Sequence, residues 1–298
     1  MRLAFLGSPE VAVTTLRALV DAGHDVCAVV TQPDARRGRG AHVSPTPVAT
    51  VAHELDIAVT HSPADLLALD PRPDLGIVVA FGQLVRPAVL AHVPMLNLHF
   101  SLLPRWRGAA PVERALLAGD AVTGVCVMGV EQGLDTGPVY TRVELPIRSD
   151  HTATSLRQEL AEAGTAALLG LLERLPLPEP VAQRGEPTYA AKITSEDRRL
   201  SAAMAATQLD RVVRVGGAWC LTDRGRLKVN EATVQPAAAL RAPVAPGSID
   251  RREGAVVLAG ADSSEFVVRL DTVAPEGKSV MAATAWWAGV RGGPVRLV

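Results

Sequence analysis

Apolar positions in the first hundred residues form short continuous runs that alternate with stretches of helical spacing. The runs "RLAFLG", "HDVCAVVTQ", "DLGIVVAFG" and "MLNLHF" are short and rich in aliphatic residues, which is typical of buried strands. Between them, "VAVTTLRALVDAG", "TPVATVAHEL" and "PAVLAHV" repeat apolar residues every three or four positions, which predicts helices. This alternation predicts an α/β fold with a parallel, doubly wound sheet.

The pattern changes after residue 110. A predicted helix, "APVERALLAGD", is followed by two β-rich segments, "AVTGVCVMGV" and "GPVYTRVELPI", which we expect to extend the sheet in antiparallel fashion. A long amphipathic helix over "SLRQELAEAGTAALLGLLERL" then ends at the rigid segment "PLPEP". We therefore predict a first domain over residues 1–185, a linker over 186–201 and a second domain over 202–298.

The second domain has a different composition of elements. Its strand-like runs "RLKVNEATV", "GAVVLAG" and "EFVVRLDTV" are separated by turns of Gly, Pro and Asp. Short strands at this spacing predict a small β-barrel. From Arg198 onward 14 Arg and Lys residues stand against 9 Asp and Glu residues, a net charge of +5. Such a surplus suits a polyanionic partner, and a solvated surface explains it equally well.

Overall composition limits the class of protein. The chain has 298 residues, of which 48% are hydrophobic, so it is expected to fold into globular domains. Its three cysteines form no Cys-x-x-Cys pair, which argues against a disulfide framework or a zinc knuckle. No window approaches the 18 or so apolar residues of a membrane span, so we expect no membrane association and a cytoplasmic location.

The stretch "LNLHFSLLPRWRGAAP" carries the first candidate chemistry. Asn97 and His99 are two residues apart, so on a strand their side chains share a face. Ligands of open α/β sheets bind beyond the carboxyl ends of the strands, where this polar pair is expected to lie. A pair of hydrogen-bonded core residues is the alternative interpretation.

The segments "SLLPRWRGAAP" and "EQGLDTGP" resemble the folate-dependent formyltransferases, and among them the enzymes that act on methionyl-tRNA. The resemblance extends through "LGSPEVA", "TQPD", "VVAFGQ", "YAAKI" and "AATAWWAGV". It implies a Rossmann-like formyltransferase domain followed by a smaller barrel that is like an oligonucleotide-binding (OB) fold. It also implies transfer of a formyl group from 10-formyltetrahydrofolate to the amino group of initiator methionyl-tRNA, with release of tetrahydrofolate.

The resemblance assigns catalytic roles to three residues. Asn97 and protonated His99 would donate hydrogen bonds to the anionic oxygen of a tetrahedral intermediate. Asp135, which follows His99 by 36 positions as the family pattern expects, would favour the charged imidazole and help a water carry the proton. An ordinary turn aspartate is the alternative for Asp135.

Two further segments are candidate binding sites. The resemblance implies that Ser101, Leu102, Leu103 and Pro104 bind folate, although the two leucines could also fill the core. In "QPDARRGRGAHVSP", Arg36, Arg37 and Arg39 stand among glycines and are expected to contact acceptor-stem phosphates, with a solvated loop as the alternative. The histidines show no metal-ligand spacing, so we expect no metal.

The resemblance is incomplete before the second domain. The segment "RVGGAW" is shorter than the proline-containing segment usual in the family. This difference concerns the tRNA contacts of the second domain and not the catalytic residues. Two other functions are alternatives: formylation of a small amine such as an amino sugar nucleotide, and folate or RNA binding without catalysis. We expect the protein to be a monomer.

Overall fold

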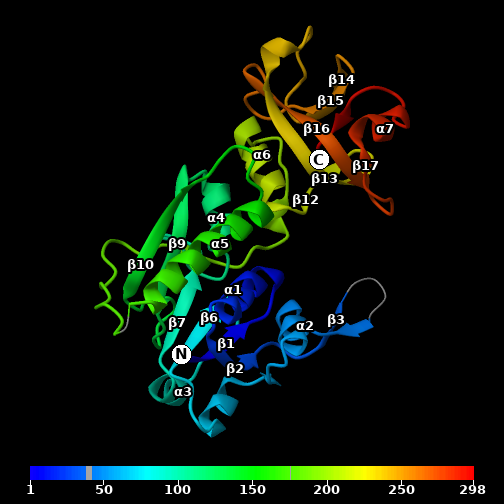
Figure 1. Cartoon of the computed structure of the whole chain (residues 1–298). Coiled ribbons are helices and arrows are strands. Elements are labelled where there is room, and N and C mark those ends of the chain that lie inside the picture. The colour runs from blue at the N-terminus through cyan, green and yellow to red at the C-terminus, as the bar shows by residue number, and fades with distance from the viewer. Residues whose placement is uncertain (38–41, 175) are drawn as a thin grey trace. The chain divides into compact units, whose positions relative to one another are not determined.

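A computed structural model of the chain describes residues 1–37, 42–174 and 176–298. It contains two compact units (Figure 1). The first comprises Met1–Val112, Ala121–Ile147 and Ser155–Ala191, and the second comprises Glu113–Asp120, Arg148–Thr154 and Lys192–Val298. The borders drawn from the sequence at residues 185 and 201 stay a prediction.

The first unit is built on a seven-stranded sheet in the order β10-β9-β7-β6-β1-β2-β5. Its inner strands pair in parallel, whereas β7 with β9 and β9 with β10 are antiparallel. The predicted parallel sheet with an antiparallel extension is thus confirmed. The strands are β1 (Arg2–Gly7), β2 (Asp25–Val30), β5 (Val59–Thr60), β6 (Leu75–Val79), β7 (Met95–His99), β9 (Val122–Gly129) and β10 (Val139–Pro146).

Helices α1 (Glu10–Asp21) and α5 (Ala153–Leu172) lie together on one face of this sheet (Figure 1). The Thr15 and Thr165 hydroxyls are 2.8 Å apart, which joins the two helices. Gly164 of α5 packs so closely that a Cβ there would lie 2.7 Å from a methyl of Val125 and 3.2 Å from one of Leu98. Because Leu98 faces α5, its neighbours on β7 face the opposite side of the sheet.

The remaining elements of the first unit connect these strands. They are the helices α2 (Pro47–Glu54) and α3 (Pro87–His92), the 3-10 segment η1 (Pro63–Ala68), the hairpin β3 (Ala35–Arg37) with β4 (His42–Ser44), and the parallel pair β8 (Arg107–Gly108) with β11 (Tyr189–Ala190). Helix α4 (Pro111–Ala118) runs from the first unit into the second. In the described part of the chain, no helix is long and apolar enough to cross a membrane.

The second unit is an antiparallel sheet in the order β12-β13-β16-β15-β14-β18, with β17 beside β16. The strand order is open, and an isolated antiparallel bridge pairs Thr222 of β12 with Leu297, the residue after the last strand. This arrangement confirms a C-terminal β domain of the expected kind. Its elements are α6 (Ala206–Val215), β12 (Ala218–Thr222), β13 (Gly225–Pro236), η3 (Ala237–Ala239), β14 (Ser248–Arg252), β15 (Ala255–Leu258), β16 (Phe266–Pro275), β17 (Met281–Ala282), α7 (Ala283–Ala288) and β18 (Val295–Arg296).

The shortened "RVGGAW" segment makes a tight connection from α6 to β12. Gly216 and Gly217 have φ angles of 91° and 72°, in the left-handed region that glycine enters without a steric penalty. Two glycines therefore suffice to turn the chain from the helix into the strand.

An ion pair secures the entry to the second unit. Arg114 donates to both carboxylate oxygens of Asp197, at 2.7 and 3.1 Å, beside the 3-10 segment η2 (Glu196–Arg198). These bonds, with a further one from the backbone N–H of Thr194, lower the pKa of Asp197 to about 2.

Candidate active site

Asn97 and His99 lie at the carboxyl end of β7, on the face away from α5. Strand β7 runs between β6 and β9, and Asn97 pairs with Val78 and Met128. The Asn97 side chain is half-buried, and it makes no hydrogen bond to any other described residue. Its amide is therefore available to a ligand, which argues against the alternative of a hydrogen-bonded core pair.

The imidazole of His99 is almost fully buried and is held from both sides. Its Nε2 atom lies 2.9 Å from the backbone oxygen of Trp106. A carbonyl oxygen can only accept, so Nε2 carries the hydrogen in this arrangement. Its Nδ1 atom lies 3.6 Å from Oδ2 of Asp135, which is beyond hydrogen-bond reach and within range of a strong charge interaction. The structure thus brings the predicted His99 and Asp135 together.

Asp135 is fixed by its own loop and by the loop that follows β7. Its Oδ2 atom accepts a hydrogen bond of 2.8 Å from the backbone N–H of Gly108. Its φ angle is 51°, a left-handed conformation that aspartate tolerates better than most residues. Two residues later, a Cβ at Gly137 would lie 1.8 Å from the backbone oxygen of Gly129, so only glycine fits there.

The predicted folate-binding segment, Ser101 to Pro104, is partly buried, and its buried side chains stabilise the loop that follows β7. Ser101 is buried and its hydroxyl donates to the backbone oxygen of Arg105 at 2.5 Å. Leu103 packs in a buried cluster, and Leu102 is half-buried against Gly124 of β9. A cis peptide bond joins Leu103 to Pro104. The cluster around Leu103 consists of Cys126, Met128 and Val139.

The predicted phosphate-binding arginines belong to a hairpin after β2. Arg36 and Arg37 lie on β3, which pairs with β4. Arg39 lies outside the described residues. Nothing in the structure therefore tests the interaction of these arginines with a phosphate.

Sequence reasoning missed one structural part of the site, which is the segment over residues 181–188. Its Thr188 hydroxyl accepts a hydrogen bond of 2.9 Å from the N–H of Trp106. The side chain of Gln183 contacts both the Asp135 loop and Arg107. These partners are 46 to 82 residues apart in the chain, so no local pattern could reveal them.

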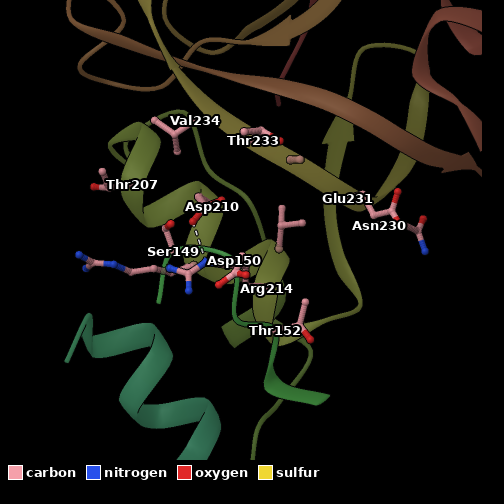
Figure 2. A pocket seen from close by; sticks show the side chains of 13 residues that line it. Ser149, Asp150, Thr152, Thr207, Asp210, Arg214, Asn230, Glu231, Thr233 and Val234 are labelled. Atoms are coloured by element: carbon pink, nitrogen blue, oxygen red, sulfur yellow. Dashed lines mark hydrogen bonds and ion pairs between the residues drawn. The ribbon is translucent and has the colours of Figure 1, made fainter. Parts of the chain in front are cut away.

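A separate pocket of about 550 Å³ lies within the second unit (Figure 2). Asp210 and Arg214 of α6 point toward it and form an ion pair of 2.7 Å with each other. Arg214 also donates to the backbone oxygen of His151 at 3.1 Å. The pocket contains none of the site residues predicted from the sequence. The charges of Asp210 and Arg214 are already paired with each other.

Comparison with known proteins supports the assignment of both units. A family model described as formyl transferase matches residues 1–172, and one described as formyl transferase, C-terminal domain matches residues 192–291. Methionyl-tRNA formyltransferase of Corynebacterium glutamicum is 39% identical over 98% of each chain. The protein of the same name from Rhizorhabdus wittichii is 42% identical over 95% of this chain and 93% of its own.

A similar arrangement is found among solved structures. HypX from Aquifex aeolicus in complex with tetrahydrofolic acid matches with a TM-score of 0.66 and 19% identity, over 96% of this chain and 47% of its own. At this identity the match shows the fold only.

Proposed function

The chain belongs to the formyl transferase family, and on this premise we propose that it transfers the formyl group of 10-formyltetrahydrofolate to the amino group of initiator methionyl-tRNA. The observation that carries the proposal is the placement of His99 beside Asp135, with the side-chain amide of Asn97 two residues away on the same strand and bonded to no other described residue. Similarity to enzymes named for this acceptor over nearly the whole chain supports it.

The three side chains suit the charge that develops in formyl transfer. Attack of the amine on the formyl carbon forms one C–N bond and places negative charge on the formyl oxygen. The amide N–H of Asn97 and an imidazolium N–H of His99 would stabilise that oxygen in advance of the reaction. Because Nε2 already bonds the Trp106 carbonyl, the N–H offered by His99 would be the one on Nδ1.

Asp135 would then serve the proton transfer. As the C–N bond to the folate nitrogen breaks, the attacking amine loses a proton and the folate nitrogen gains one. The carboxylate lies 3.6 Å from Nδ1 of His99, where it would interact favourably with an imidazolium. It can also orient a water between the attacking amine and the folate nitrogen.

The loop from Ser101 to Pro104 would contribute to folate binding mainly by its shape. Ser101 and Leu103 are buried and hold the loop in place, whereas Leu102 and Pro104 are only half-buried and can contact a flat ring. The apolar side chains of Leu102 and Pro104, together with the donors Asn97 and His99, suit a pterin. The proposed reaction requires no metal.

For the acceptor, we propose that Arg36, Arg37 and Arg39 contact phosphates of the tRNA. The hairpin that carries them follows β2, and phosphate contacts by arginine are strong without reading sequence. Because the acceptor takes part in translation, the proposal implies a cytoplasmic protein. We also propose a monomer, which light scattering after size exclusion would test.

The decisive experiment is transfer from labelled 10-formyltetrahydrofolate to charged initiator tRNA. Elongator methionyl-tRNA, free methionine and an amino sugar nucleotide serve as alternative acceptors. Preference for the initiator tRNA is the expected result. Transfer to the amino sugar alone would support the second enzymatic function, and binding without transfer would indicate a protein that is catalytically idle.

A further inference from the structure

Gln183 lies after α5, in the segment over residues 181–188, and its half-buried side chain makes four hydrogen bonds. Its Nε2 atom donates to the backbone oxygens of Asp135 and Gly137, both at 2.8 Å. Its Oε1 atom accepts from Nε and Nη2 of Arg107, at 3.0 and 2.6 Å. One amide thus connects the Asp135 loop to the loop that carries Trp106 and Gly108.

The chemistry of these partners requires an amide. A guanidinium group only donates and a backbone oxygen only accepts, so the side chain between them must offer an acceptor on one side and two donors on the other. Only asparagine and glutamine have both, and the partners fix which end of the Gln183 amide is oxygen. A carboxylate here would keep the contact with Arg107 and lose both contacts with the loop.

These bonds bear on the position of the Asp135 carboxylate. The left-handed backbone of Asp135 is a conformation that neighbouring contacts must maintain. Gln183 holds its carbonyl oxygen, Gly108 holds its Oδ2 atom, and His99 lies 3.6 Å from that oxygen. Release of the carbonyl would let the loop move and carry the carboxylate away from His99.

We propose that Gln183, oriented by Arg107, is a positioning residue that sets the location of the Asp135 carboxylate during formyl transfer. This inference rests on the proposed function, because it assumes that Asp135 acts in the reaction.

The test compares Gln183→Glu and Gln183→Met with the wild-type chain. Gln183→Glu retains the Arg107 contact and lacks the donors, and Gln183→Met keeps the volume without hydrogen bonds. Displacement of a reacting group by about 1 Å can cost about 10²-fold, so we expect kcat to fall by about 10- to 100-fold in both. The KM for tRNA should change by less than about threefold. Gln158→Met is the control, since the exposed Gln158 amide bonds Thr14 and Glu162, far from the Asp135 loop in sequence.

A second measurement separates positioning from a general structural role. In an Asp135→Asn background, Gln183→Glu should lower kcat by less than about threefold, because the charge that it positions is already gone. Independent effects that multiply in the double variant would overturn the inference, as would wild-type kcat in a folded Gln183→Glu variant. A wild-type chain that formylates no charged tRNA would instead overturn the proposed function, so the two failures are distinguishable.

Discussion

Replacement of Asp135 by asparagine isolates the charge of this side chain. The Oδ1 atom of an asparagine can still accept the 2.8 Å hydrogen bond from the Gly108 N–H, so the loop should keep its conformation. The negative charge 3.6 Å from Nδ1 of His99 is lost. The change therefore removes the interaction proposed to favour imidazolium and leaves the local geometry in place.

The size of the effect follows from the separation and the burial of the pair. Two unit charges at this distance attract by about 5 kcal/mol at an effective dielectric constant of about 20, and by about 1 kcal/mol in bulk water. The side chains of His99 and Asp135 are 6% and 16% exposed, which places the pair between these limits. A loss of about 3 kcal/mol corresponds to a decrease of about 10²-fold in kcat.

The assay is formyl transfer to charged initiator tRNA at saturating folate, measured across pH. The Asp135→Asn variant should show the reduced maximum together with an altered pH–rate profile. Asp21→Asn, an exposed change at the end of α1, is the matched control and should behave as the wild type. A folded Asp135→Asn variant with the wild-type maximum and profile would refute the coupling between Asp135 and His99.

Three other predictions address the donors, the acceptor and the second unit. His99→Ala and Asn97→Ala should each lower kcat by about 10²–10³-fold, and wild-type turnover in either folded variant would refute its role. Asn97→Ala should change the melting temperature little, whereas His99→Ala should lower it because a buried side chain and its bond to the Trp106 carbonyl are lost. Arg39→Ala should weaken the use of tRNA while folate binding stays unchanged, and the activity of the variant should depend less steeply on salt than that of the wild type. Equal salt slopes in the two proteins would argue against a phosphate contact by Arg39. Asp197→Asn should destabilise the second unit by about 1 kcal/mol at neutral pH, because solvent screens this partly exposed ion pair; urea unfolding followed by tryptophan fluorescence measures the change. Since the folded pKa of Asp197 is lowered to about 2, mainly by Arg114, this contribution is present above pH 4 and should disappear as the pH falls toward 2; an equal difference at pH 2 and pH 7 would contradict it.

The elements that the sequence predicted well are those whose signal is local. Short aliphatic runs became the strands of the first sheet because burial on both faces requires apolar residues at every position. Asn97 and His99 were correctly placed on one face of their strand, because side chains two residues apart on a strand point to the same side. The proximity of His99 and Asp135 was predicted from the family resemblance, and in the structure Nδ1 of His99 lies 3.6 Å from Oδ2 of Asp135.

Features that depend on distant partners were not predictable in this way. Ala206 at the start of α6 has no capping side chain beside it, and Asp262 supplies the acceptor for its N–H from 56 residues away. The interaction of Gln183 with the Asp135 loop spans a similar separation. Such bonds satisfy buried polar groups wherever the fold brings a partner, so only the assembled chain reveals them.

The choice of acceptor must be made outside the catalytic centre. In the proposed reaction Asn97, His99 and Asp135 act on the formyl group and on one amine, and a small amine presents the same reacting atoms as aminoacylated tRNA. Discrimination therefore needs groups that meet the rest of the acceptor. The net charge of +5 from Arg198 onward and the arginines of the hairpin after β2 suit a phosphate backbone. Asn97, His99 and Asp135 together carry no comparable positive charge. A variant in which the hairpin arginines are replaced, and which no longer uses tRNA, should thus retain its formyl transfer to a simple amine. Recognition of the tRNA and catalysis would involve different atoms of the protein.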